Sequence, residues 1–313
     1  MPATTAAAAF PSLTPQRLGR IRARLLAWHG EHGDDFPWRT SRDPYAALVA
    51  GVCSQQTQMA RVLPLWRRWM AAFPTLAAAA GASRARALRV WGRAGYPRRA
   101  LALREAVRLC LRAHGSALPR EQAALLALPG VGPFTAAVVF SFGFGDDAPA
   151  VDTNAVRVIG RLLLGDLQPA RESAPRTLAA AAARLLPPGA GPRWNAALME
   201  YGARVCTPRP RCGGCVVATL CVARPRFERG ECAQPLRAQP RFEGSDRQWR
   251  GRILGLLRER REPLRMAALL NALAEDMEQR ARVRRLLEAL CADGLAWARR
   301  GRCGLGEPPR GVR

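Results

Sequence analysis

Lysine is missing from the sequence, and all 49 basic residues of the Lys and Arg class are arginine. Without a side-chain amine the chain cannot form a Schiff base, which excludes covalent catalysis by lysine. No apolar run approaches the roughly 18 residues that a membrane-spanning helix needs, and the alanine-rich beginning lacks the basic residues of a secretory signal. We therefore expect an intracellular, cytoplasmic protein that does not associate with membranes.

Acidic residues are also few. The 24 Asp and Glu leave a formal charge of +25 on 313 residues, well beyond the roughly 2–8 charges that suit the solubility of a small domain. The charge predicts a polyanionic partner, with nucleic acid as the first choice. An anionic membrane surface ranks behind it, because no helical segment sets Arg on one face against Trp and Leu on the other. Hydrophobic residues still make up 49%, which excludes wholesale disorder.

Strand-like alternation is absent from the first two thirds of the chain, so we expect an all-α fold there. Residues 1–15 are rich in Ala and Pro and predict a flexible tail, and from residue 16 to about residue 186 the pattern is almost entirely helical. Short breakers with Pro or Gly separate its helical segments. Apolar residues recur at helical spacing in 18–28, 46–53, 61–73, 84–92, 98–114 and 135–142.

The last part of the chain predicts a second domain. A polar linker over 225–244 leads into residues 245–308, where helical spacing covers 249–260, 266–275 and 280–291. Asp293 and Gly294 then signal a turn, followed by a short apolar stretch at 295–297. Three helices with a small hairpin resemble a winged-helix module, and a generic three-helix cap is the alternative.

Four of the nine cysteines lie close together, in a loop over residues 206–221 with the spacing C-x5-C-x2-C-x5-C. In an intracellular chain such a cluster is more typical of metal binding than of disulfides. The central pair can reach one metal centre, and the flanking gaps let the loop wrap around it. Four thiolates suit either a zinc ion or a [4Fe–4S] cluster. The candidate ligands are Cys206, Cys212, Cys215 and Cys221.

A second motif, LPGVG at 128–132, lies between two helical segments. Gly130 and Gly132 allow close backbone approach, and the N–H groups of the following helix can bind phosphate without a side chain. An ordinary helix–helix turn is the alternative. About twenty residues later Asp152 precedes the helical segment 153–164, with Asn154 close behind. The simplest role for Asp152 is that of a helix N-cap.

These motifs in this order resemble the helix–hairpin–helix (HhH-GPD) DNA glycosylase superfamily. The greatest similarity is to the MutY family, whose members remove adenine opposite 8-oxoguanine. The resemblance covers about residues 16–224, and residues 245–308 resemble a terminal domain of some members. The matching stretches are Phe36-Pro37-Trp38-Arg39, Asp43-Pro44-Tyr45, Gln55-Gln56-Thr57-Gln58, Trp91 with Gly95-Tyr96, LPGVG, Asp152 with Asn154, and the cysteine loop.

The resemblance implies a bilobed helical fold and a role for each matching residue. Asp152 corresponds to the carboxylate that stabilises the sugar cation after the base departs. The four cysteines correspond to the ligands of a [4Fe–4S] cluster. Gln56 and Thr57 correspond to residues that fill the DNA stack and contact the opposite base, and Tyr96 to a residue wedged into the duplex. The DNA-binding residues implied are Gln56, Thr57, Tyr96, Gly130, Gly132 and Asn154.

The chain departs from the family pattern at several positions. Gly51 occupies the position of the glutamate that protonates the departing adenine. Phe134 replaces a Tyr, at the position where lyases of the superfamily carry Lys, so a lyase activity is disfavoured. Ala94 and Pro97 replace a Leu and a second Tyr. The first cysteine gap is one residue shorter than the usual six.

The sequence therefore predicts a monofunctional DNA N-glycosylase that removes adenine mispaired with 8-oxoguanine or guanine. We expect it to act as a monomer on double-stranded DNA, in the cytoplasm and associated with the nucleoid. Two alternatives follow from Gly51: a glycosylase for another base, such as a mismatched pyrimidine, and a non-catalytic binder of DNA lesions. We expect Gly51→Glu to increase adenine release and Asp152→Asn to abolish activity.

Overall fold

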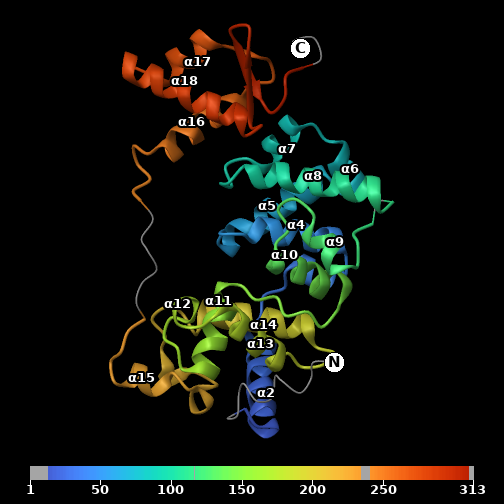
Figure 1. Ribbon diagram of the computed structural model, residues 1–313, viewed down its shortest axis with the longest axis vertical. Coiled ribbons are helices and arrows are strands. Elements are labelled where there is room, and N and C mark those ends of the chain that lie inside the picture. Colours follow the sequence, from blue (N-terminus) through green and yellow to red (C-terminus); the bar gives the residue numbers. More distant parts are fainter. Residues whose placement is uncertain (1–12, 116, 234–239, 310–313) are drawn as a thin grey trace. The chain divides into compact units, whose positions relative to one another are not determined.

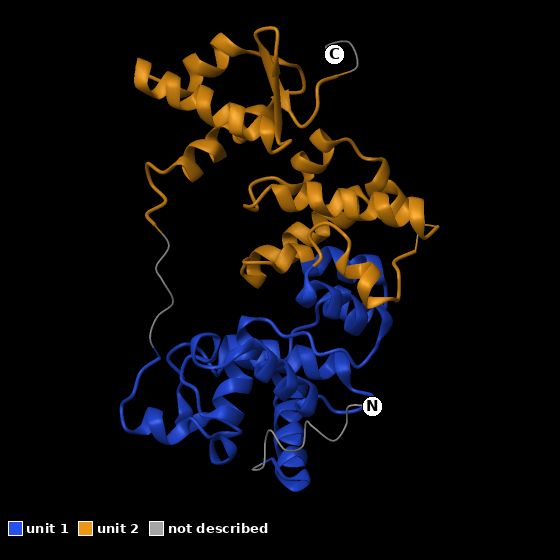
Figure 2. Ribbon diagram, viewed as in Figure 1, with its two compact units in different colours: residues 1–51, 132–238 blue, residues 52–131, 239–313 orange. Residues whose placement is uncertain are grey.

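The computed structural model describes residues 13–115, 117–233 and 240–309. The tail predicted over residues 1–15 lies outside this description as far as residue 12. The described chain is predominantly helical with one small sheet (Figure 1), in agreement with the helical spacing of the sequence. It forms two compact units, of which unit 1 comprises residues 1–51 and 132–238, and unit 2 residues 52–131 and 239–313 (Figure 2). None of the described helices is long and apolar enough to span a membrane.

Unit 1 is built from helices and short helical turns. Helix α4 begins in it and ends in unit 2. Its elements are α2 (Pro15–His32), α3 (Pro37–Thr40), α4 (Pro44–Ser54), α10 (Pro133–Val138), η1 (Val139–Phe144), α11 (Thr153–Ile159), η2 (Gly160–Leu164), α12 (Pro169–Glu172), α13 (Pro175–Leu185), α14 (Gly191–Arg204), η3 (Cys212–Gly214), η4 (Ala218–Leu220) and α15 (Arg224–Glu228).

The first helix, α2, shows how the sequence sets this fold. The Thr14 side chain caps it by accepting a hydrogen bond from the backbone N of Arg17 at 3.2 Å, and Pro15 occupies the first helical position. Apolar residues recur every three or four positions, which places them on one face. That face packs against α14 and joins the core of unit 1. Its buried residues are Leu18, Ile21, Leu25 and Trp28.

Two helices of unit 1 end in π-helical turns. The sequence predicts one helix over 135–142 and another over 153–164. The structure instead divides each of them, into α10 and η1 and into α11 and η2. Gly145 and Gly165 end these turns with φ of 82° and 79°, a conformation that glycine adopts without a steric penalty. Consecutive residues are buried in both turns, at 141–143 and at 160–163, so the spacing of apolar residues gives no sign of them.

Unit 2 combines five helices from the middle of the chain with the C-terminal module, residues 245–308. The three strands pair antiparallel in the order β1-β3-β2, and Ala298 and Leu264 both pair with Cys303. The elements are α5 (Met59–Ala72), α6 (Leu76–Gly81), α7 (Arg84–Trp91), α8 (Arg98–Ala113), α9 (Gln122–Leu126), α16 (Asp246–Glu259), β1 (Leu264–Arg265), α17 (Met266–Leu273), α18 (Met277–Ala292), β2 (Ala296–Arg299) and β3 (Arg302–Leu305).

Polar contacts attach the C-terminal module to α7 and α8. The Glu307 carboxylate accepts from the backbone N of Arg84 at 3.1 and 3.0 Å, at the beginning of α7. Asp293 forms ion pairs with both Arg98 of α8 and Arg250 of α16. A carboxylate at a helix N-terminus is favoured by the helix dipole. The module is therefore part of unit 2.

Candidate active site and cysteine loop

Asp152 caps α11 in unit 1, as the sequence predicts. Its Oδ1 accepts from the backbone N of Ala155 at 2.7 Å, and its Oδ2 accepts from Nδ2 of Asn154 at 2.9 Å. The side chain is half-buried. Burial raises the pKa of Asp152, and the hydrogen bonds from Ala155 and Asn154 oppose that rise. The result is a fixed carboxylate at the N-terminus of a helix.

Arg157 connects Asp152 to the cysteine loop, through contacts that sequence reasoning missed. Its Nη2 donates to Oδ1 of Asn154 at 2.8 Å, and Asn154 in turn donates to Asp152. Its Nε donates to the backbone carbonyl of Cys206 at 2.6 Å, and Nη2 also reaches the carbonyl of Gly202 at 2.6 Å. One guanidinium therefore contacts both the carboxylate network and the first residue of the loop. A single Arg among 49 gives no signal in the sequence.

Gly51, where the resemblance leads us to expect a glutamate, is buried in α4 against α10. A Cβ atom at this position would lie 3.0 Å from Cγ2 of Thr135 and 3.4 Å from Cγ1 of Val138. The first distance is tighter than ordinary van der Waals contact, and the second lies at its lower limit. Neither neighbour carries an acid, so neither can replace the glutamate as a proton donor. The packing here suits a residue without a side chain.

Glu200 of α14 is a glutamate that is present in unit 1, where it is buried and ionised. Burial alone would raise its pKa, but His29, with Nε2 3.8 Å from Oε1, and an ion pair with Arg39 lower the pKa to about 2. The backbone N of Asp34 also donates to it at 3.0 Å. An acid with this pKa holds no proton at neutral pH. Glu200 therefore anchors Arg39 and is unsuited to protonate a leaving base.

Gln56, Thr57 and Tyr96 lie in unit 2, in two turns. Gln56 follows the end of α4 and is exposed, with a φ of 51°. Tyr96 precedes α8 with a φ of 45° and 49% of its surface exposed. Arg99 contacts both turns, because its guanidinium donates to Oγ1 of Thr57 at 3.1 Å and lies 5.2 Å from the Tyr96 ring centroid. An exposed aromatic ring beside an arginine is a typical surface for nucleic acid.

The LPGVG turn spans the boundary between the units. Gly130 belongs to unit 2 and has a φ of 77°. A Cβ atom there would lie 2.9 Å from Cβ of Ala102. The positive φ and this close approach both require glycine in the turn. The side chain of Gln55 donates to the carbonyl of Gly130 at 2.9 Å. Gly132 belongs to unit 1 and caps α10.

The four cysteines line one pocket of unit 1, together with Tyr201 and Arg161. They are free thiols. The Tyr201 hydroxyl lies 3.0 Å from Sγ of Cys215, and Nη1 of the buried Arg161 lies 3.5 Å from Sγ of Cys206. Burial raises the pKa of Cys221 to about 11. No three His, Cys, Asp or Glu side chains of the described chain form a group arranged to hold a metal ion. The donor chemistry, four thiols beside a cation, nevertheless suits a thiolate-ligated metal.

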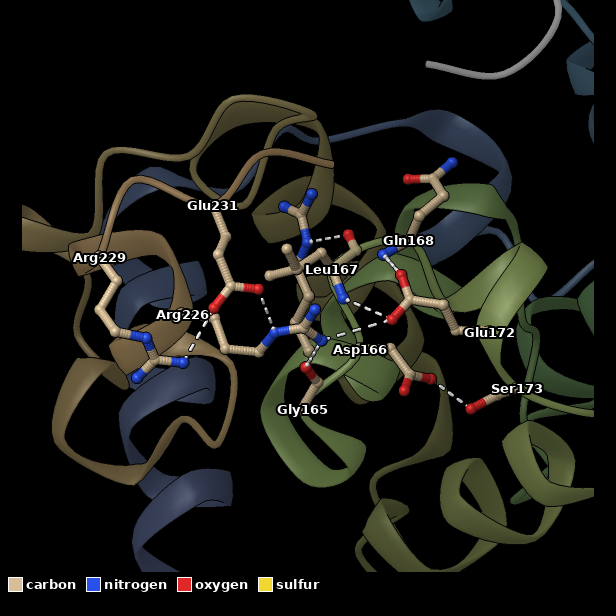
Figure 3. A network of polar contacts seen from close by, with 10 residues as sticks. Gly165, Asp166, Leu167, Gln168, Glu172, Ser173, Arg226, Arg229 and Glu231 are labelled. Carbon is tan, nitrogen blue, oxygen red and sulfur yellow. Dashed lines mark hydrogen bonds and ion pairs between the residues drawn. The ribbon is translucent and has the colours of Figure 1, made fainter. Parts of the chain in front are cut away.

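The end of the cysteine loop is fastened by a polar network between α15 and the segment from η2 to α12 (Figure 3). Nη1 of Arg226 donates to the carbonyl of Gly165 at 3.1 Å and lies 3.5 Å from Glu172. Its Nε donates to Glu231 at 2.8 Å. Glu172 also accepts from the backbone N of Gln168 at 2.5 Å. The first residues of the predicted linker 225–244 belong to α15, which ends at Glu228. Residues 234–239 of the linker lie outside the described chain.

Comparison with known proteins decides the family. Residues 49–183 match the HhH-GPD superfamily base excision DNA repair protein family. The chain is 41% identical over 273 residues to the adenine DNA glycosylase of Mycobacterium tuberculosis (strain CDC 1551 / Oshkosh), which covers 87% of this chain and 88% of that protein. The chain belongs to the HhH-GPD superfamily. Its function is therefore that of a DNA N-glycosylase in base excision repair, as the sequence predicts.

Glycosylases named for other bases are also similar to the chain. It is 32% identical over 201 residues to the thymine/uracil-DNA glycosylase of Methanothermobacter thermautotrophicus, which covers 63% of this chain and 89% of that protein. A solved structure of a thermostable thymine-DNA glycosylase matches with a TM-score of 0.61 and 28% identity, over 67% of this chain and 98% of that one. The proteins similar to the chain thus include glycosylases named for adenine and glycosylases named for thymine.

Proposed function

We propose that the chain removes adenine paired with 8-oxoguanine or with guanine, by hydrolysing the N-glycosidic bond in double-stranded DNA. The observation that carries the proposal is the similarity to an adenine DNA glycosylase along 87% of the chain. The half-buried carboxylate of Asp152 at the start of α11 supports it, because hydrolysis leaves an oxocarbenium-like sugar that a fixed carboxylate stabilises. With no lysine, the reaction proceeds without a Schiff base.

DNA contacts are proposed in both units. An enzyme that acts on a base has to flip it out of the stack, and side chains inserted into the duplex offset part of the cost. The exposed Gln56 and Tyr96 suit that role, with Thr57 beside Gln56. Gly130, Gly132 and Asn154 are proposed to contact DNA near phosphates, since glycine turns and helix N-termini leave backbone N–H groups for anions. We propose that the protein acts as a monomer in the cytoplasm, at the nucleoid.

We also propose that a [4Fe–4S] cluster is bound by Cys206, Cys212, Cys215 and Cys221. The four free thiols around one pocket support it. Burial raises the pKa of Cys206, and the positive charge of Arg161 beside its Sγ opposes that rise. The cluster would hold the loop in shape, with its chemistry structural rather than catalytic. Residues 245–308 are proposed to form a winged-helix-like module, given their three helices and three-stranded sheet.

Gly51 favours a second candidate, a glycosylase for a mismatched pyrimidine. Adenine is a poor leaving group unless a ring nitrogen is protonated, and a positioned acid typically contributes ~10²–10⁴-fold. The neighbours of Gly51, Thr135 and Val138, supply no such acid. A pyrimidine can leave as an anion and depends less on protonation. The similarity to a thymine/uracil-DNA glycosylase supports a pyrimidine as the substrate of this second candidate. Loss of catalysis, leaving a binder of DNA lesions, is the third outcome.

A single-turnover assay on a panel of duplexes separates these candidates. The panel contains adenine opposite 8-oxoguanine, guanine and thymine, and thymine and uracil opposite guanine. We expect adenine release opposite 8-oxoguanine and guanine, and its loss in Asp152→Asn. Release of thymine or uracil alone would establish the second candidate. Tight binding to mispaired duplexes without release of any base would establish the third.

A further inference from the structure

Arg99 lies in the first turn of α8, and its guanidinium holds the end of α4. Nη1 donates to the backbone carbonyls of Val52 at 3.1 Å and Cys53 at 3.2 Å, and also to that of Gln55. The last carbonyls of a helix lack partners within the helix and carry partial negative charge. A cation at this place therefore fixes the point from which the turn containing Gln56 begins.

The same guanidinium contacts the turn that contains Tyr96. Its Nη2 donates to the carbonyl of Gly95 at 3.5 Å and to Oγ1 of Thr57 at 3.1 Å. The carbon of the guanidinium lies 5.2 Å from the ring centroid of Tyr96 and 5.3 Å from that of the buried Trp91. Both distances fall within the range of cation–π attraction. One side chain thus binds two turns that are some forty residues apart in the sequence.

Gln56 and Tyr96 also share an unusual backbone conformation. Both are exposed and both have a positive φ, 51° and 45°, that residues with a side chain rarely adopt. Such conformations persist where the surroundings impose them, and they concentrate at functional sites. Arg99 supplies those surroundings on both sides, through contacts to Gln55 and Thr57 and to the Tyr96 ring.

We propose that Arg99 is a positioning residue that holds Gln56 and Tyr96 in one fixed relation, so that both side chains enter the duplex together when the target base flips out. The inference rests on the proposed function, which assigns these two side chains to DNA. Side chains held in place before binding lose less freedom on insertion. Arg suits this role better than Lys, because its planar fork offers five donors where an ammonium group is a compact charge. Arg99 thereby acts on base flipping and leaves bond cleavage to Asp152.

The test measures flipping separately from cleavage, in the full-length Asp152→Asn variant. The probe is 2-aminopurine placed beside the target adenine opposite 8-oxoguanine, whose fluorescence rises when the stack opens. Adding Arg99→Lys should lower the flipping equilibrium about tenfold. The matched control, Arg67→Lys, changes an exposed arginine of α5 and should lower it less than about twofold. The affinity for undamaged duplex should change equally in both, because each variant keeps its charge.

A double-mutant cycle measures the coupling between Gln56 and Tyr96 in base flipping, which a purely structural role of Arg99 would leave unchanged. With Arg99 present, the effects of Gln56→Ala and Tyr96→Ala on flipping should be non-additive by about tenfold, whereas in the Arg99→Lys background they should add. Additive effects with Arg99 present overturn the inference, even if Arg99→Lys fails to fold. Full flipping in a folded Arg99→Lys variant overturns it as well. No fluorescence change on any duplex of the panel overturns the proposed function and the inference together.

Discussion

At the scale of single residues, Gly51 stands where the resemblance leads us to expect the family's glutamate. The sequence predicts that Gly51→Glu increases adenine release, and the contact at 3.0 Å from Cγ2 of Thr135 shows what this change must displace. We expect Gly51→Glu alone to destabilise the fold by about 1–3 kcal/mol through overpacking. Gly51→Glu with Thr135→Ser, which removes that methyl group, should release adenine faster than the parent, by up to ~10²–10⁴-fold.

The control for this prediction is Gly51→Ala with Thr135→Ser, which adds bulk without an acid. Single-turnover release of adenine from the duplex with 8-oxoguanine is the measurement. Equal rates in the two double variants would show that a carboxylate at position 51 does not reach the base.

Asp152 gives a prediction for pH dependence. Stabilising a sugar cation requires the ionised carboxylate, and burial raises the pKa of this group. Protonation therefore begins at a higher pH than for an ordinary Asp, whose pKa is about 3.9. We expect the excision rate to fall as the pH decreases, with its acid limb above that value, and Asp152→Asn to abolish excision at every pH. A parent rate that stays constant down to pH 4 contradicts this assignment.

A matched control separates catalysis from helix capping. Asp276 caps α18 as Asp152 caps α11, accepting from the backbone N of Gln279 at 2.7 Å. Asp276→Asn should change stability little, because Asn caps a helix about as well as Asp, and it should leave the pH profile of excision unchanged. Equal losses of activity in the two variants would show that Asp152 acts only as a helix cap and has no catalytic role.

At the scale of elements, the cysteine loop is predicted to depend on metal. Protein purified without oxygen should be brown, absorb broadly near ~400 nm and contain iron in preference to zinc. Cys215→Ser should lose the iron and part of the DNA affinity, because the shape of the loop depends on the metal. Cys232→Ser, at an exposed cysteine outside the loop, should keep both. Metal analysis that finds stoichiometric zinc and no iron would overturn the cluster.

The elements also show what a sequence pattern contains and what it lacks. Helices α7 and α8 were predicted within a residue of their ends, because an apolar face repeats along them and Ser83 caps α7. The π-helical turns were missed, because consecutive residues are buried in them and the apolar pattern there has no clear period to be disturbed. Of the site, motif residues such as Asp152 could be predicted. Arg99 and Arg157 could not, because their roles depend on contacts between segments far apart in the sequence.

At the scale of the whole molecule, the formal charge of +25 predicts binding that depends strongly on salt. Arginines that neutralise phosphates release counterions, so the affinity falls as salt rises. For roughly 6–10 phosphate contacts, the dissociation constant should increase about 10³–10⁵-fold between 50 and 200 mM salt. Fluorescence anisotropy with a labelled undamaged duplex measures this slope. An affinity independent of salt would exclude the charge as the source of DNA binding.

The discontinuity of unit 1 has a consequence for the order in which the chain is synthesised. Helix α2 packs on α14, and residues 52–131, the first segment of unit 2, are translated between them. At roughly 5–20 residues per second, the ribosome needs on the order of ten to thirty seconds to reach α14 after completing α2. During that interval the apolar face of α2, with Ile21, Leu25 and Trp28, has no α14 to cover it. A nascent chain of this protein is therefore expected to need a chaperone on that face until α14 emerges.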